Sequence, residues 1–222
     1  MDLKSLCWNV QRCGDSRFLL AAKQILHDNK PDLLVFNEPH ISGSKADYVI
    51  STVGFPNLNR TEASGSFGSI WVAWYDTIFV TILMHHFQFV HCRTTLRSNN
   101  SSFLATAVYA SPSASRRKLL WPHLRRLVTS INSTWILFGD FNATLFDSDR
   151  KIYAISARPF SAFQNLIFDY GLRDINYQAP DYTWSRGHSQ VRLDRFIYNN
   201  YWDENFAEAM VHHLHQSCEY LE

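Results

Sequence analysis

Thr134-Trp135-Ile136-Leu137-Phe138-Gly139-Asp140-Phe141-Asn142 is an apolar run that ends abruptly on Gly-Asp-Phe-Asn. A short run of bulky residues bounded by turn formers predicts a buried β-strand. Asp140 and Asn142 would then lie at its carboxyl end, where open α/β sheets place their ligands. Because they stand two residues apart, their side chains would point the same way and share one cleft. Both are also ordinary turn formers, so the rest of the chain decides between a site and a simple turn.

Polar residues also follow other predicted strands, at Asn9, Glu38, Tyr109 and Asp194. Asn9 and Glu38 belong to a predicted β-α-β unit, whose two parallel strands end at the same edge of a sheet. Carboxylate and amide oxygens suit a hard cation such as Mg²⁺, which keeps water and substrate phosphate as further ligands. Such an ion would neutralise charge on a phosphoryl group while a carboxylate orients or deprotonates water.

The remaining pattern predicts a mixed α/β fold. Residues 69–75, 78–84 and 87–93 read as strands with no helix between them, which favours antiparallel pairing. Residues 54–68 are rich in Gly, Pro, Asn and Ser and predict a loop. Helices are expected from Ser115 to Val128 and over residues 159–170.

Composition bounds the class of protein. The chain has 222 residues, 46% of them hydrophobic, and a formal net charge of +1. It can therefore bury a large core, and any nucleic-acid surface must be a local patch. The four cysteines form no CxxC pair, which suits a reducing compartment. With no signal-peptide core and no membrane-length apolar run, we expect an intracellular soluble protein without membrane contact.

Three other chemistries find little support. His85, His86, His91, Cys92, His212, His213 and His215 offer zinc ligands in principle, but without the paired spacing of a structural site. A Gly-x-Ser-x-Gly elbow and a phosphate-binding Gly-rich loop are both missing, which argues against an α/β hydrolase and a nucleotide kinase.

Seven short motifs carry a resemblance to a known family. They are Trp8-Asn9-Val10, residues 36–43 (Phe-Asn-Glu-Pro-His-Ile-Ser-Gly), Gly68-Ser69-Ile70-Trp71, residues 108–112 (Val-Tyr-Ala-Ser-Pro), residues 138–142 (Phe-Gly-Asp-Phe-Asn), Tyr182-Thr183-Trp184 and residues 191–195 (Val-Arg-Leu-Asp-Arg). Their order and approximate spacing resemble the endonuclease/exonuclease/phosphatase superfamily, and most of all the endonuclease domain of plant LINE-type (non-LTR) retrotransposons. The resemblance implies one domain over residues 1–222 with a DNase I-like fold: a four-layered α/β sandwich of two packed mixed sheets with outer helices.

The resemblance also implies an activity and partners. The expected reaction is Mg²⁺-dependent phosphodiester hydrolysis, with Mn²⁺ as a possible substitute, that nicks double-stranded DNA and leaves a 3′-hydroxyl to prime reverse transcription. A reverse transcriptase domain in a longer parent polyprotein and a nuclear location would follow from the same resemblance. Two alternatives stay open. One is a catalytically inactive nucleic-acid-binding remnant that uses Arg116, Arg117, Arg125 and Arg126, and the other is a phosphatase of the same superfamily.

Site residues carry over from the family motifs one by one. Glu38 resembles the family's Mg²⁺ ligand, with Asn9 beside it, and Tyr109 its phosphate-contacting tyrosine. Asp140 matches the aspartate that positions and activates water, and Asn142 the amide that holds the phosphate. Asp194 matches the carboxylate that orients a catalytic histidine, while the resemblance places Thr183, Trp184 and Arg195 on the substrate side. Without the resemblance, Tyr109 and Trp184 have a core-aromatic role as their alternative.

The chain departs from the family at three places. Arg12 replaces a usual glycine, Pro39 replaces a usual threonine, and Ser217-Cys218-Glu219 stands where the family closes with Ser-Asp-His. Loss of one member of a concerted acid/base set commonly lowers the rate by a few orders of magnitude. We therefore expect a truncated or degenerate last motif and impaired catalysis, unless His212, His213 or His215 substitutes for the missing histidine.

Overall fold

The computed structural model describes residues 3–10, 13, 16–60, 69–151, 161–178 and 180–214. The described residues form two compact units, one up to Tyr109 and the other from Ala110 onward. The expected single domain stays a prediction. None of the described helices is long and apolar enough to cross a membrane.

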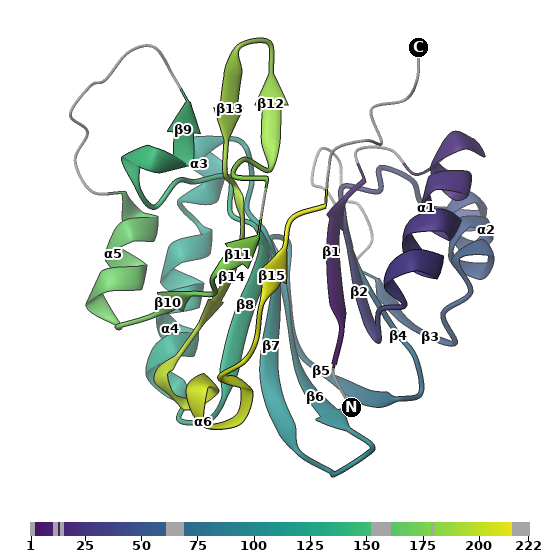
Figure 1. The fold of residues 1–222 in the computed structure, drawn as a ribbon, viewed down its shortest axis with the longest axis horizontal. Helices are drawn as coiled ribbons and strands as arrows, with labels where there is room; N and C mark the ends of the chain where they lie inside the picture. The colour runs from purple at the N-terminus through teal and green to yellow at the C-terminus, as the bar shows by residue number, and fades with distance from the viewer. Residues whose placement is uncertain are drawn as a thin grey trace. The chain divides into compact units, whose positions relative to one another are not determined.

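The first unit contains two sheets and two helices (Figure 1). Its elements are β1 (Ser5–Asn9), α1 (Ser16–Asn29), β2 (Leu33–Asn37), α2 (Gly43–Val53), β3 (Asn57–Arg60), β4 (Ile70–Trp74), β5 (Ile78–His86), β6 (Phe89–Leu96) and β7 (Ser102–Tyr109). One sheet has the order β1-β2-β4-β3, and β5, β6 and β7 form an antiparallel run. Since β1 and β2 are parallel and joined by α1, the predicted β-α-β opening is confirmed.

Helices α1 and α2 lie over one face of the β1–β4 sheet (Figure 1). The core between them is aromatic, with Trp8 against Phe18 at 5.3 Å and Phe36 against Trp71 at 6.4 Å between ring centroids. Phe18 is 2% exposed, and burial of one such side chain stabilises the fold by roughly 1.5–3 kcal/mol. Phe18 of α1 thus contacts aromatic rings of both β1 and β2.

The predicted loop at 54–68 is wrong over residues 57–60. These form strand β3, whose partner is β4 in antiparallel register. Asn57 and Asn59 gave this strand a turn-like composition, but pairing with β4 overrides so weak a local preference. Residues 61–68 of that prediction lie outside the described residues.

The second unit is built around β8, which is buried along its whole length as the opening stretch predicts. Its elements are α3 (Ala114–Arg117), α4 (Leu120–Ser130), β8 (Trp135–Asp140), η1 (Asp147–Asp149), β9 (Arg150–Lys151), α5 (Ala162–Asp169), β10 (Arg173–Asp174), β11 (Tyr177–Gln178), β12 (Trp184–Arg186), β13 (Ser189–Val191), β14 (Asp194–Tyr198), η2 (Asn200–Trp202), α6 (Asp203–Phe206) and β15 (Val211–His212). Strand β14 pairs antiparallel with both β8 and β10. Helices α4 and α5 pack through the stacked rings of Trp121 and Phe163, whose centroids lie 5.6 Å apart.

The predicted helix from Ser115 to Val128 is divided into α3 and α4. Pro122, the third residue of α4, has no backbone N–H with which to continue a helical bond to the carbonyl of Lys118. It is tolerated in the first turn of a new helix, where N–H groups have no helical partner. The division makes α3 a short element that follows the end of β7 by only a few residues.

The helix expected over residues 159–170 is shorter than predicted. It starts at Ala162, and Ser161 and Gln164 form a reciprocal capping box at its beginning. Residues 152–160 lie outside the described part of the chain.

Candidate active site

In the first unit, the ends of β1, β2 and β7 bring Asn9, Glu38 and Tyr109 together. Asn9 lies opposite Asn37 in the parallel register, and the amide of Val10 donates to the Asn37 carbonyl at 2.9 Å. The hydroxyl of Tyr109 donates a hydrogen bond to Oε1 of Glu38. Asn37 reaches the same strand β7, because its Nδ2 donates to the Val108 carbonyl at 3.3 Å. The edge predicted from the β-α-β opening therefore holds a carboxylate, a carboxamide and a phenol.

The turn that presents Glu38 has an unusual backbone. Glu38 and His40 both adopt left-handed φ angles, 58° and 51°. This conformation is costly for residues with a Cβ, and the residue before a proline is normally extended. The carbonyl of Pro39 accepts hydrogen bonds from the backbone N–H of Cys13 at 3.2 Å and from its thiol at 3.3 Å. Burial raises the pKa of the Cys13 thiol to about 12, so the thiol stays protonated and able to donate.

Two features decide whether these residues fit Mg²⁺. Oδ1 of the fully buried Asn37, the residue before Glu38 in the chain, has no hydrogen-bond partner among the described residues, so this oxygen acceptor is left to a water or an ion. The described residues contain no group of three or more His, Cys, Asp or Glu side chains that could hold a metal. One carboxylate and neighbouring amide oxygens fit an ion that takes most of its ligands from water and substrate.

In the second unit, Asn142 clamps the carboxylate of Asp140. Its backbone N–H donates to Oδ1 of Asp140 at 2.7 Å, and its Nδ2 donates to Oδ2 at 3.0 Å. Nδ2 also donates to the Ala110 carbonyl at 2.8 Å, which engages both of its hydrogens. In this conformation Asn142 therefore orients Asp140, and its expected contact with phosphate stays a prediction.

Asp194 lies directly opposite Asp140 in the antiparallel pair of β14 and β8. Paired residues of this kind have side chains on the same face, so two carboxylates meet there. Burial raises the pKa of the Asp194 carboxyl, while the Thr183 hydroxyl and the charge of Arg192 oppose that shift. Thr183 also accepts the backbone N–H groups of Leu193 at 2.9 Å and Asp194 at 3.1 Å. Thr183 thus fixes the turn that carries Asp194.

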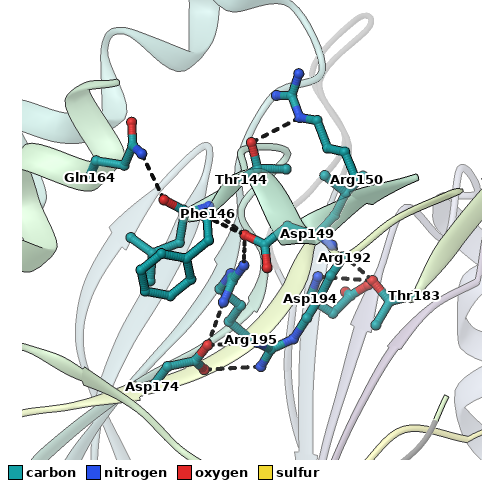
Figure 2. A network of polar contacts seen from close by, with 12 residues as sticks. Thr144, Phe146, Asp149, Arg150, Gln164, Asp174, Thr183, Arg192, Asp194 and Arg195 are labelled. Carbon is teal, nitrogen blue, oxygen red and sulfur yellow. Dashed lines mark hydrogen bonds and ion pairs between the residues drawn. The ribbon is translucent and has the colours of Figure 1, made fainter. Parts of the chain in front are cut away.

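Arg195 occupies a different environment from the one predicted. Its side chain is completely buried, and its guanidinium bonds to Asp149 and Asp174 (Figure 2). Arg192 joins the same network at 2.9 Å from Asp174. An arginine with no exposed surface cannot contact a substrate in this conformation, so the expectation of a substrate-binding Arg195 is corrected to a structural role.

The remaining predicted residues have positions that neither support nor oppose their expected roles. Trp184 is half-buried at the start of β12, opposite Val191, and its contact with DNA stays a prediction. His213 donates from Nδ1 to the Pro180 carbonyl at 2.6 Å, and burial lowers its pKa. Arg12, His215 and the Ser217-Cys218-Glu219 segment lie outside the described residues.

Sequence reasoning missed the position of Arg117. The sequence offers it only as one of four arginines of the nucleic-acid-binding alternative, yet its Nη1 donates to the carbonyls of Ser111 at 2.7 Å and Pro112 at 3.0 Å. Burial lowers the pKa of Arg117, and the nearby charge of Asp140 opposes that effect. The one available signal was its closeness in sequence to the end of β7.

The fold resembles several solved nucleases and phosphatases. The endonuclease domain of TRAS1, a telomere-specific non-LTR retrotransposon, has a TM-score of 0.64 at 15% identity, with 88% of this chain and 83% of that chain covered. An AP endonuclease from Archaeoglobus fulgidus has a TM-score of 0.61 at 15% identity, covering 89% and 87%. The 3′ phosphatase NExo from Neisseria, bound to product DNA hairpin, has a TM-score of 0.60 at 17% identity, covering 90% and 87%.

These likenesses confirm the predicted fold class, an α/β sandwich with mixed sheets and outer helices. Among proteins with curated descriptions, none matches the sequence significantly. The model of the Endonuclease/Exonuclease/phosphatase family matches residues 6–212, which is nearly the whole chain. The chain therefore belongs to the Endonuclease/Exonuclease/phosphatase family.

Proposed function

We propose that the chain is a Mg²⁺-dependent phosphodiesterase that nicks double-stranded DNA, with catalysis impaired relative to intact members of its family. The observation that carries the proposal is the clamped Asp140, whose two carboxylate oxygens are both held by Asn142 at the end of a buried strand. A carboxylate fixed in this way can orient a water and take its proton. Family membership supports hydrolysis as the reaction class.

Glu38 and Asn9 are the residues that would hold the metal. When bound, Mg²⁺ supplies positive charge for the phosphate oxygens. Tyr109 would keep the Glu38 carboxylate in one orientation through its hydrogen bond. The left-handed turn at Glu38 supports the same assignment, because strain of this kind persists where a side chain has to be aimed.

The proposed impairment rests on the surroundings of Asp194. Among the described residues, the groups that act on the Asp194 carboxyl are Thr183 and Arg192, and neither is a histidine. A carboxyl whose pKa is raised by burial is also a weaker partner for an imidazolium than a fully ionised one. Without an oriented acid at this place, departure of the leaving group would be slow.

Supercoiled plasmid gives the direct test. The purified protein is incubated with Mg²⁺, Mn²⁺ or EDTA, and conversion to open circles is followed over time. We expect slow, metal-dependent nicking that Asp140→Asn and Glu38→Gln abolish. Asp203→Asn, which neutralises an exposed carboxylate paired with Arg173 at 2.5 Å, is the matched control.

Each departure from that result has a defined meaning. No nicking with either metal would refute hydrolysis of DNA by this chain, and phosphate release from a panel of phosphorylated small molecules would then favour a phosphatase. Nicking as fast as that of an intact retrotransposon endonuclease domain under the same conditions would refute the impairment.

The DNA-binding alternative is weakened by the place of Arg125. Its guanidinium lies 3.7 Å from the Asp169 carboxylate, so it does not present a fully solvated charge. The DNA-binding alternative would be supported by a salt-dependent affinity for DNA that is unchanged in Asp140→Asn and falls when the charges of Arg125 and Arg126 are reversed.

A further inference from the structure

Arg117 and Asn142 bind the same short loop. The side-chain amide of Asn142 donates to the Ala110 carbonyl, and Nη1 of Arg117 donates to the next two carbonyls, those of Ser111 and Pro112. Because consecutive Cα atoms lie about 3.8 Å apart, these contacts bring a guanidinium close to the carboxamide that clamps Asp140. The loop is attached to Asp140 as well, since the Ala110 N–H donates to the Asp140 carbonyl at 2.7 Å.

Within the described part of the chain, the hydrogen bonds of this guanidinium use Nη1 alone. Nε and Nη2 keep donors that can serve a ligand. Arg117 is half-buried between the exposed neighbours Arg116 and Lys118, so its charge is less hydrated than theirs. A half-buried cation beside an acidic group has a strong electrostatic effect on an incoming anion.

The proposed reaction needs a cation at this place. A phosphodiester is an anion, and Asp140 would repel it. An arginine that approaches the phosphate with two parallel N–H groups offsets this repulsion and also fixes the orientation of the phosphate. Arg117 and Asp140 are attached to the same loop, through the Ser111 carbonyl and the Ala110 N–H respectively, and the charge of Asp140 acts on the pKa of Arg117.

We propose that Arg117 is a substrate-binding residue of the Asp140 site, where its Nε and Nη2 donate to the phosphate group that undergoes cleavage. The inference rests on the proposed function and adds to it a specific contact with the charged phosphate oxygens. Loss of a hydrogen bond to a charged group weakens binding by roughly 10- to 100-fold, which sets the expected size of the effect.

The test uses two short duplexes of the same sequence, one with ordinary phosphodiesters and one with a central run of uncharged methylphosphonates. Affinity is measured in EDTA, so that cleavage does not contribute. Arg117→Gln should bind the ordinary duplex at least about tenfold more weakly than wild type does. For the methylphosphonate duplex, the variant and wild type should have the same affinity. Arg117→Lys, which keeps the charge and loses the paired N–H groups, should lie between them.

A purely structural role gives a different pattern. If Arg117 only supports the Ser111–Pro112 loop, Arg117→Gln will weaken binding of both duplexes equally, and this result would overturn the inference. Lys118→Gln removes one charge from the neighbouring exposed position and is the matched control. If Lys118→Gln lost as much affinity as Arg117→Gln, and again only for the charged duplex, the inference would also be overturned.

Failure of the proposed function is recognised separately. If wild type neither nicks plasmid nor binds either duplex, the DNA nuclease proposal falls and the inference falls with it. If wild type binds or nicks DNA and Arg117→Gln behaves like wild type, only the inference is refuted. Urea unfolding of each variant confirms that the compared proteins are folded.

Discussion

The hydroxyl of Tyr109 donates to the carboxylate of Glu38, 71 residues away in the chain. Tyr109 ends β7 and Glu38 follows β2, so one hydrogen bond joins strands from the two sheets of the first unit. A second hydrogen bond, from Nδ2 of Asn37 to the Val108 carbonyl, joins the two residues that directly precede Glu38 and Tyr109. Together they hold Glu38 where three strand ends meet.

Tyr109→Phe should therefore affect both stability and activity. The variant keeps the ring, which is 5% exposed, but leaves the carboxylate without its donor. We expect a loss of about 1–2 kcal/mol in the free energy of unfolding and at least a tenfold loss in nicking rate. Urea titration and the plasmid assay measure the two quantities. Tyr48→Phe removes a hydroxyl from a side chain that is 64% exposed, and equal losses there would contradict the assignment.

The left-handed backbone at Glu38 makes a second prediction. Glu38→Ala and Glu38→Gly both remove the carboxylate, but only glycine adopts a φ of 58° without strain. Glu38→Gly should therefore be more stable than Glu38→Ala by about 0.5–1 kcal/mol, although both should fail to nick DNA. The same pair of substitutions at Ser51 in α2 should give the opposite order, because alanine is the better helix former. Alanine proving the more stable at both positions would show that Glu38 is unstrained.

Strand ends were the part of the site that sequence could predict. The apolar runs before Asp140 and Glu38 have the composition and length of buried strands, and both residues lie where those runs predict. The hydrogen bond between Tyr109 and Glu38 could not be predicted from the sequence in the same way. It depends on how two sheets pack, and no local pattern reports that.

The burial of Arg195 follows from the alternation of side chains along β14. Arg195 and Ile197 are buried in β14 while Asp194, Phe196 and Tyr198 are less so, as period-two alternation requires. That alternation places Arg195 on the core face. Its partners Asp149 and Asp174 come from separate short elements, so the ion pairs could not be predicted. The motif likeness favoured a substrate role that the geometry does not support.

The buried network predicts a large effect on stability. Arg195→Met would leave Asp149 buried with its charge uncompensated, although the backbone N–H groups of Leu145 and Phe146 still donate to it at 2.7 Å. Breaking a buried pair in this way should cost about 3–5 kcal/mol in the free energy of unfolding, measured in urea or as loss of soluble protein.

Arg173→Met is the matched control for that change. Arg173 pairs with Asp203 at 2.5 Å, but both side chains are about half exposed. Removal of this pair should change the stability by no more than about 1 kcal/mol. Similar effects at Arg173 and Arg195 would mean that the Arg195 network contributes no more than a surface ion pair.

Stability should also fall in mild acid because of His91. This side chain is 4% exposed, its Nδ1 lies 2.8 Å from the Thr106 hydroxyl, and burial lowers its pKa from 6.5 to about 4. Between pH 6.5 and about 4, the His91 imidazole is therefore neutral in the folded protein but protonated in the unfolded chain. The free energy of unfolding should decrease as the pH falls from 6.5 toward 4, by at most about 1.4 kcal/mol per pH unit for this group.

His91→Gln tests this dependence, because glutamine does not titrate. Urea midpoints at several pH values should show a shallower decline for the variant than for wild type, while His213, whose pKa is also lowered, contributes in the same direction to both. The difference between the two curves isolates His91, since the carboxylates are common to both proteins. His27→Gln, at a side chain 80% exposed, is the matched control. Parallel curves for wild type and His91→Gln would mean that His91 takes up its proton equally in the folded and unfolded states, so its burial would not govern acid stability.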